Sequence, residues 1–110
     1  MKLPNGHRAY VDIKKLRDYC FSESHLTGKH KARVFRAALG WGQENEDELL
    51  ELLIAAADSK DSIPGKWTSY GQLYTVDIDV DGLFGPITIR SGWIVRKDED
   101  FPRLTTCYVL

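Results

Sequence analysis

The feature that most constrains the fold is a stretch of two-residue periodicity between Tyr70 and Arg96. Apolar residues alternate with Thr and Asp over residues 74–81, and alternate again with polar residues over 87–96. The glycine-containing segment Asp81–Pro86 separates the two halves. Such alternation places one set of side chains in a core and the other in water, so the pattern predicts an antiparallel hairpin. Gly92, inside the second half, predicts a bulge.

Helical spacing precedes this hairpin. Apolar residues spaced three to four apart predict helices over residues 12–21 and 29–39, with Asp12 capping the first and Gly40 ending the second. Asn45 and Glu48 resemble a capping box before the apolar run over residues 49–57, which predicts a third helix. A last strand is expected over residues 103–109.

Helices followed by strands, rather than alternating with them, indicate an α+β fold. We therefore expect three N-terminal helices packed on one face of a three- to four-stranded antiparallel meander sheet. The 110 residues, 43% of them hydrophobic and 28% charged, can form one core, so residues 1–110 are expected to be a single domain.

Several function classes have no support in the sequence. The net charge of -1 and pI near 6.3 exclude a globally basic nucleic-acid-binding surface. Nucleotide-binding glycine loops, zinc motifs and GxSxG are missing, so we expect no cofactor and no metal. Cys20 and Cys107 are expected to be buried thiols. No window resembles a signal peptide or membrane span, which favours a cytoplasmic protein without membrane contact.

The densest cationic cluster lies over residues 25–36. Its members are His25, Lys29, His30, Lys31, Arg33 and Arg36. If a helix begins near Lys29, its N-terminal amides add to this positive field and favour phosphate binding. A histidine there could transfer protons near neutral pH. The alternative is an ordinary solvated helix face whose charges form salt bridges.

A second polar set lies on the predicted last strand. It consists of Arg103, Thr105, Thr106 and Tyr108. A regular strand would place Thr106 and Tyr108 on the same face as Leu104 and Leu110, with Arg103 and Thr105 opposite. Hydroxyl and guanidinium groups can hold a phosphate, and a tyrosine can stack on a base. The alternative is strand propensity alone, because Thr and Tyr favour sheets.

The order of motifs resembles a family of small, uncharacterised bacterial domains over nearly the whole chain. The matching segments are Lys2-Leu3-Pro4, Lys15-Leu16 with Tyr19, His25 and Gly28 before Lys31-Ala32 and Phe35, Leu39-Gly40, Tyr70-Gly71, Tyr74, Gly85-Pro86, Trp93-Ile94-Val95, and Pro102-Arg103-Leu104 with Thr106 and Tyr108. In this family, helices precede a meander sheet whose last strand is polar. This order of elements is similar to that of the ribonuclease toxins of the barnase, EndoU, colicin and RelE types. The family usually continues its Thr-x-Tyr with a proline, whereas Val109 follows here.

The resemblance implies a metal-independent endoribonuclease toxin that cleaves RNA through attack of the 2'-hydroxyl on the adjacent phosphate. His25 or His30 would then act as base or acid, Lys31 and Arg103 as phosphate stabilisers, and Thr106 and Tyr108 as sheet-borne contacts. Lys29, Arg33 and Arg36 would bind RNA, and a small antitoxin or immunity protein would be the partner.

A second interpretation is a non-catalytic protein-interaction module of a toxin–antitoxin or phage-related pair. Its binding surface would be Asp77, Asp79 and Asp81 or an exposed sheet edge. The three aspartates could also hold a hard cation, although they lack the spacing of a calcium loop. An exposed edge would permit dimerisation without requiring it.

Overall fold

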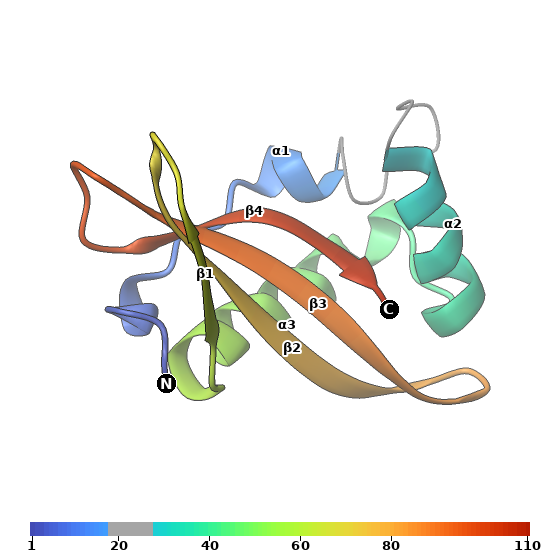
Figure 1. Cartoon of the computed structure of the whole chain (residues 1–110). Helices are drawn as coiled ribbons and strands as arrows, with labels where there is room; N and C mark the ends of the chain where they lie inside the picture. The colour runs from blue at the N-terminus through green and yellow to red at the C-terminus, as the bar shows by residue number, and fades with distance from the viewer. Residues whose placement is uncertain (18–27) are drawn as a thin grey trace.

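A four-stranded antiparallel sheet with strand order β1-β2-β3-β4 forms the C-terminal half of the chain (Figure 1). Its strands are β1 (Ile63–Trp67), β2 (Gly71–Gly82), β3 (Gly85–Arg96) and β4 (Pro102–Val109). The computed structural model describes residues 1–17 and 28–110, with side chains from residue 31 onward in the second range. The predicted hairpin is confirmed, because β2 pairs with β3 from Gly71↔Arg96 to Gly82↔Gly85.

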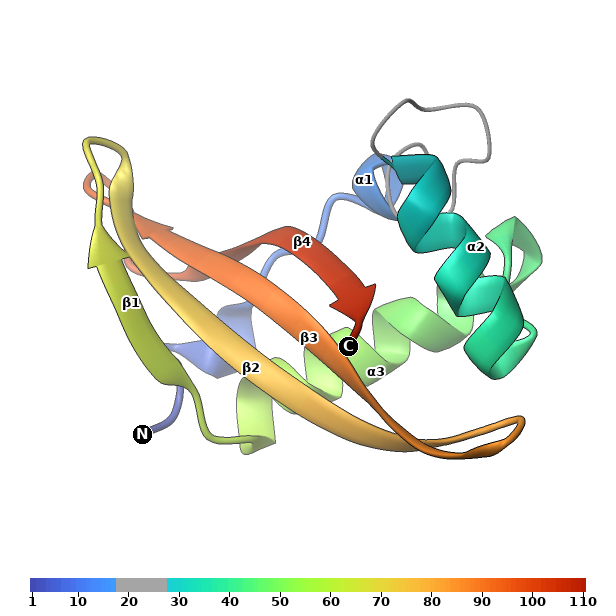
Figure 2. The ribbon, with the colours of Figure 1, turned by 45° about the vertical axis from the view of Figure 1, so that its right-hand side comes forward.

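The helices precede the sheet. In chain order they are η1 (Gly6–Arg8), α1 (Ile13–Lys15), α2 (Gly28–Leu39), η3 (Gln43–Asn45) and α3 (Glu46–Ser59), where η marks a short 3₁₀ turn. Helix α3 runs across one face of the sheet, and α2 stands beside the end of β4 (Figures 1 and 2). We call the face covered by α3 the inner face and the opposite one the outer face.

The prediction of three N-terminal helices packed on one sheet face is wrong. Among residues 1–17 and 28–110, only α2 and α3 are long, with 12 and 14 residues, whereas α1 spans three. Asp12 does cap α1, accepting a hydrogen bond from the Lys14 amide at 3.0 Å. Ile13 is half-buried and packs against the core, and Leu16, which follows α1, is fully buried in it. The remainder of the predicted helix falls on residues 18–21, outside the described residues.

The two long helices begin and end close to the predicted positions. Gly40 ends α2 in a left-handed conformation at φ 73°, with its amide donating to the Arg36 carbonyl. The predicted capping box of α3 is wrong, since Asn45 makes no side-chain cap. Its Oδ1 instead accepts from the Gly42 amide at 3.1 Å, which closes the preceding η3 turn. Of the described helices, none is long and apolar enough to cross a membrane.

The core lies between α3 and the inner face. Side chains at alternate strand positions meet Leu49 and Leu53 of α3 and Phe35 of α2, all fully buried. The strand members are Val76, Ile78, Ile89, Trp93, Leu104 and Cys107. Each large apolar side chain buried here contributes about 1.5–3 kcal/mol. Cys107 is buried as predicted, while Cys20 lies outside the described residues.

Strand β1 was not predicted as a strand. Its residues show no alternation, and all five are exposed. Pro64 is tolerated because β1 is an edge strand that pairs only with β2. Backbone pairing rather than side-chain burial therefore specifies this element.

Candidate functional site

A bulge between β3 and β4 determines which side chains of β4 reach the outer face. Gly92 pairs with Thr106, but the next residue, Trp93, pairs with Leu104, so Thr105 is the extra residue. The bulge predicted at Gly92 is thereby confirmed. It reverses the alternation of β4, and both Leu104 and Cys107 are buried.

The prediction that Thr106 and Tyr108 share a face with Leu104 is consequently wrong. Thr106 pairs with Gly92 and Tyr108 with Arg90, both of which alternate with the buried residues Ser91 and Trp93. Antiparallel partners point to the same side of a sheet, so Thr106 and Tyr108 lie on the outer face. Because of the bulge at Thr105, Leu104 faces the core while Thr106 and Tyr108 face outward.

A hollow of about 200 Å³ opens on the outer face around Thr106 and Tyr108. Lys31 of α2 reaches it from beyond the edge strand. Its ammonium group donates to Thr106 Oγ1 at 2.8 Å and stands 5.4 Å from the centroid of the Tyr108 ring. An amine, a hydroxyl and an aromatic ring from two elements 75 residues apart in sequence therefore converge at one point.

Arg90 supplies a second cation to this hollow. Its Nε and Nη2 donate to the two carboxylate oxygens of Asp77 at 2.8 and 2.9 Å, leaving Nη1 outside the ion pair. Hydrogen bonds from Arg90 lower the pKa of Asp77, and those same bonds, with a further contribution from Tyr108, raise the pKa of Arg90. The guanidinium is therefore permanently charged and held side-on next to Tyr108.

Arg103, predicted to stabilise a phosphate, is engaged elsewhere. Its Nε and Nη2 donate to Glu99 at 2.7 and 2.6 Å, and its guanidinium lies 4.9 Å from the Tyr10 ring centroid and 5.1 Å from that of Phe101. The ion pair lowers the pKa of Glu99 and raises that of Arg103. This packing ties the β3–β4 loop and the N-terminal segment to β4.

The other predicted site residues are distributed along α2 and before it. Arg36 donates to Glu44 at 2.7 Å and to the Gly40 carbonyl at 3.2 Å, so it serves the end of α2. Arg33 is exposed. His25 lies outside the described residues, as do the side chains of Lys29 and His30, although His30 directly precedes Lys31 in α2.

The three aspartates at alternate positions of β2 have different surroundings. Asp77 pairs with Arg90, Asp79 accepts from Thr88 Oγ1 at 2.8 Å, and Asp81 is exposed. Within residues 1–17 and 28–110, no three histidine, cysteine or acidic side chains gather as a metal site would require. Asp77 and Asp79 thus have hydrogen-bond partners within the sheet.

Sequence reasoning missed Arg90, although a signal for it was present. The hairpin loop is Leu83-Phe84 between Gly82 and Gly85, and counting outward from it places Asp77 opposite Arg90. A two-residue loop would have predicted this register. The approach of Lys31 to Thr106 had no comparable signal, because it depends on how α2 packs beside β4.

Comparisons with known proteins agree with this architecture. One chain of a solved contact-dependent growth inhibition toxin–immunity protein complex from Klebsiella pneumoniae 342 matches with a TM-score of 0.69 and 23% identity. The match covers 94% of this chain and 95% of that chain, and at this identity it shows a shared fold. A search of curated proteins gave no match. The family described as "Domain of unknown function (DUF6883)" matches residues 2–110, and the chain belongs to that family.

Proposed function

We propose that this chain is a toxin domain that cleaves RNA, with the scissile phosphate held in the outer-face hollow between α2 and β4. The observation that carries the proposal is the convergence of Lys31, Thr106 and Tyr108, with Arg90 beside them. Two cations and two hydroxyl groups match the oxygens of a phosphodiester in charge and in hydrogen-bonding capacity. The shared fold with one chain of a toxin–immunity protein complex supports a role in such a pair.

The reaction is attack of the ribose 2'-hydroxyl on the adjacent phosphorus. A bond forms between the 2'-oxygen and phosphorus, the bond to the 5'-oxygen breaks, and a 2',3'-cyclic phosphate is left. A base must take the 2'-hydroxyl proton and an acid must protonate the departing 5'-oxygen. His25 and His30 are our candidates for these roles, while Lys31 and Arg90 stabilise the added negative charge on the phosphate oxygens.

Thr106 and Tyr108 orient the phosphate through their hydroxyl groups. Arg103 contributes by holding the neighbouring loop through Glu99 rather than by direct phosphate contact. Lys29 and Arg33 extend the positive charge along α2, whereas Arg36 stabilises the end of that helix. A small immunity or antitoxin protein that covers the outer face would block the site.

The test is cleavage of total RNA by purified, partner-free protein in excess EDTA. Lys31→Ala is expected to reduce the rate about 100- to 1,000-fold, since it removes one preorganised charge donor. Tyr108→Phe keeps the ring beneath Lys31 and removes only the hydroxyl, so it should have a smaller effect. Lys66→Ala is the matched control, because Lys66 is an exposed lysine on β1.

Two results would contradict the proposal. One is cleavage that Lys31→Ala and Tyr108→Phe leave unchanged, because the hollow would then not hold the phosphate. The other is failure of the folded parent protein to cut RNA at any concentration. His25→Ala and His30→Ala, assayed alongside, identify the acid–base group.

A second candidate function is a non-catalytic protein-interaction module. It is favoured by the β1 edge, where Ile63 and Trp67 are 65% and 73% exposed. Edge strands with exposed apolar side chains offer a template for another chain. A folded protein that cuts no RNA and loses binding to a small partner protein on Trp67→Lys would support this candidate.

A further inference from the structure

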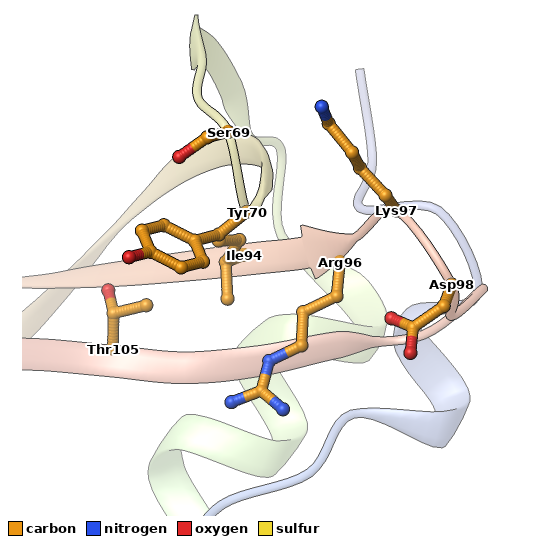
Figure 3. A pocket seen from close by; sticks show the side chains of 7 residues that line it. All are labelled: Ser69, Tyr70, Ile94, Arg96, Lys97, Asp98 and Thr105. Atoms are coloured by element: carbon orange, nitrogen blue, oxygen red, sulfur yellow. The ribbon is translucent and has the colours of Figure 1, made fainter.

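A larger hollow, of about 520 Å³, opens on the outer face at the other end of β3 (Figure 3). It lies where the β1–β2 turn meets the end of β3 and the β3–β4 loop. Its lining residues are Ser69, Tyr70, Ile94, Arg96, Lys97, Asp98 and Thr105. None of the roles assigned above uses this hollow.

Tyr70 presents its ring at this hollow from a fixed turn. The residue is 75% exposed, yet its amide donates to Thr68 Oγ1 at 3.1 Å and its carbonyl accepts from the Lys97 amide at 3.2 Å. The next residue, Gly71, has φ 152°, and a Cβ there would collide with the Val95 carbonyl and Arg96 Cα. The turn therefore holds an exposed aromatic ring against the end of β3.

The two cations that line this hollow, Arg96 and Lys97, differ from most of the described arginines in forming no ion pair within the described part of the chain. Arg8, Arg17, Arg36, Arg90 and Arg103 each form an ion pair with a carboxylate. Arg96 and Lys97 form none with the described residues, and both are exposed. Figure 3 shows the Arg96 side chain extending across the strand that carries Thr105, whereas the Lys97 side chain points in the opposite direction. The charge of Arg96 also lowers the pKa of Glu99, but no ion pair within residues 1–17 and 28–110 engages its guanidinium. An exposed cation beside an exposed aromatic ring suits a nucleotide, which offers a phosphate and a base.

The hollow continues toward the candidate site. Thr105 lines three hollows. They are the 520 Å³ hollow, the 200 Å³ hollow of the candidate site, and a third of about 190 Å³ that Lys15 also lines. The outward residues of β3 that connect them are Arg90, Gly92, Ile94 and Arg96. Six residues of strand separate Arg90 from Arg96 by about 20 Å, too far for one phosphate to contact both. The Tyr70 hollow is thus a separate subsite on the same face.

We propose that the Tyr70–Arg96 hollow binds a second nucleotide of a single-stranded RNA whose backbone crosses the outer face from the Lys31 site. The base stacks on Tyr70 against Ile94, and Arg96 holds the phosphate. Asp98 at the rim opposes the phosphate and limits affinity. This inference rests on the proposed RNA-cleaving function and names the path of its substrate.

The experiment measures binding of a fluorescent single-stranded oligonucleotide made of 2'-O-methyl ribose, which cannot undergo 2'-hydroxyl attack. Tyr70→Ala should weaken binding about tenfold, while Tyr70→Phe should bind like the parent. Arg96→Ala should also weaken binding and reduce the slope of log affinity against log salt by about one. Asp98→Asn should strengthen binding. Trp67→Ala is the matched control, since Trp67 is equally exposed but does not line the hollow.

The outcomes separate the two proposals. One outcome is that the parent cleaves RNA while Tyr70→Ala and Arg96→Ala bind the oligonucleotide as tightly as the parent. That outcome overturns the subsite and leaves the proposed function standing. Oligonucleotide binding that requires Tyr70 and Arg96 in a protein that never cleaves RNA sustains the subsite and overturns cleavage. Absence of RNA binding by the folded parent, or equal losses in Trp67→Ala and Tyr70→Ala, overturns the subsite.

Discussion

The two faces of β3 differ in almost every physical property. On the inner face, Ile89, Ser91 and Trp93 are fully buried among apolar side chains. On the outer face, Arg90 and Arg96 stand beside open hollows at either end of the strand. The inner face therefore provides the free energy of folding, whereas the outer face keeps charges and hydroxyl groups accessible.

The comparison shows that the bulge at Thr105 lets β4 contribute apolar side chains to the inner face and polar side chains to the outer face. If Thr105 were paired as an ordinary strand residue, with no bulge, regular alternation would turn Thr106 and Tyr108 to the same side as Leu104. Polar groups would then enter the core, where unpaired hydroxyls are costly. The bulge lets Leu104 and Cys107 both reach the inner face while Thr106 and Tyr108 remain outside.

The largest expected effect is on the inner face. Trp93→Ala should lower the free energy of unfolding by about 3–5 kcal/mol, because it removes a fully buried indole from the centre of the core. Denaturant unfolding measures the change. Ile94→Ala, one residue along on the outer face, is the control and should lower it by about 1 kcal/mol or less. Equal losses in the two variants would contradict the division between the faces.

A smaller effect is expected from the buried hydrogen-bond chain of the inner face. Ser91 Oγ accepts from Trp93 Nε1 at 2.9 Å and donates to the Val76 carbonyl at 2.8 Å. Ser91→Ala leaves the indole N–H buried without a partner, so unfolding should become easier by about 1–3 kcal/mol. Thr88→Val, which removes an exposed hydroxyl from the outer face, should change stability by about 0.5 kcal/mol or less in the same assay.

The inner face was predictable from the sequence to a large extent, and the helices only in part. Alternation over residues 74–96 identified the hairpin and its buried members, because burial of one sheet face imposes period two. Helix length near the N-terminus was not predictable in this way. The spacing of Ile13 and Leu16 fits a long helix and a single turn equally well, because both side chains pack at the core in either case.

The outer face could be predicted far less well. Lys31, Thr106 and Tyr108 were identified as candidates one by one, from chemistry and resemblance, but their proximity results from the packing of α2 beside β4. Tyr70 matched the family pattern without any assigned role and Arg96 carried no motif, since their juxtaposition depends on the turn before Gly71 and on the pairing of β2 with β3. Sites assembled from exposed residues of several elements leave no periodic signal.

Gly92→Ala tests whether the centre of the outer face must remain open. A Cβ at this position would lie 2.9 Å from Thr105 Oγ1 and 3.1 Å from Thr106 Cγ2, so both side chains must shift. We expect stability to fall by about 1 kcal/mol and RNA cleavage to fall more than that loss explains. Unfolding and cleavage assays on one preparation measure both. Full activity would show that the hollow beside Thr106 is not used.

The smallest stability effect is expected at the ion pair of the outer face. Asp77 and Arg90 are 35% and 38% exposed, so Asp77→Asn should lower the free energy of unfolding by only about 0.2–1 kcal/mol near neutral pH. Hydrogen bonds from Arg90 hold the pKa of Asp77 below its ordinary value near 3.8 in the folded state. The unfolded chain therefore binds a proton first as the pH falls.

The sign of the pH dependence follows from this order. The stabilisation by Asp77 is fully present above pH 3.8 and is lost as the pH falls through the lower, folded-state pKa. Unfolding measured from neutral pH into this acid range should show the parent and Asp77→Asn converging. A difference that persists unchanged at the lowest pH would mean that the carboxylate acts through packing rather than charge. RNA cleavage should fall with Asp77→Asn even where stability barely changes, because Arg90 then loses the partner that holds it beside Tyr108.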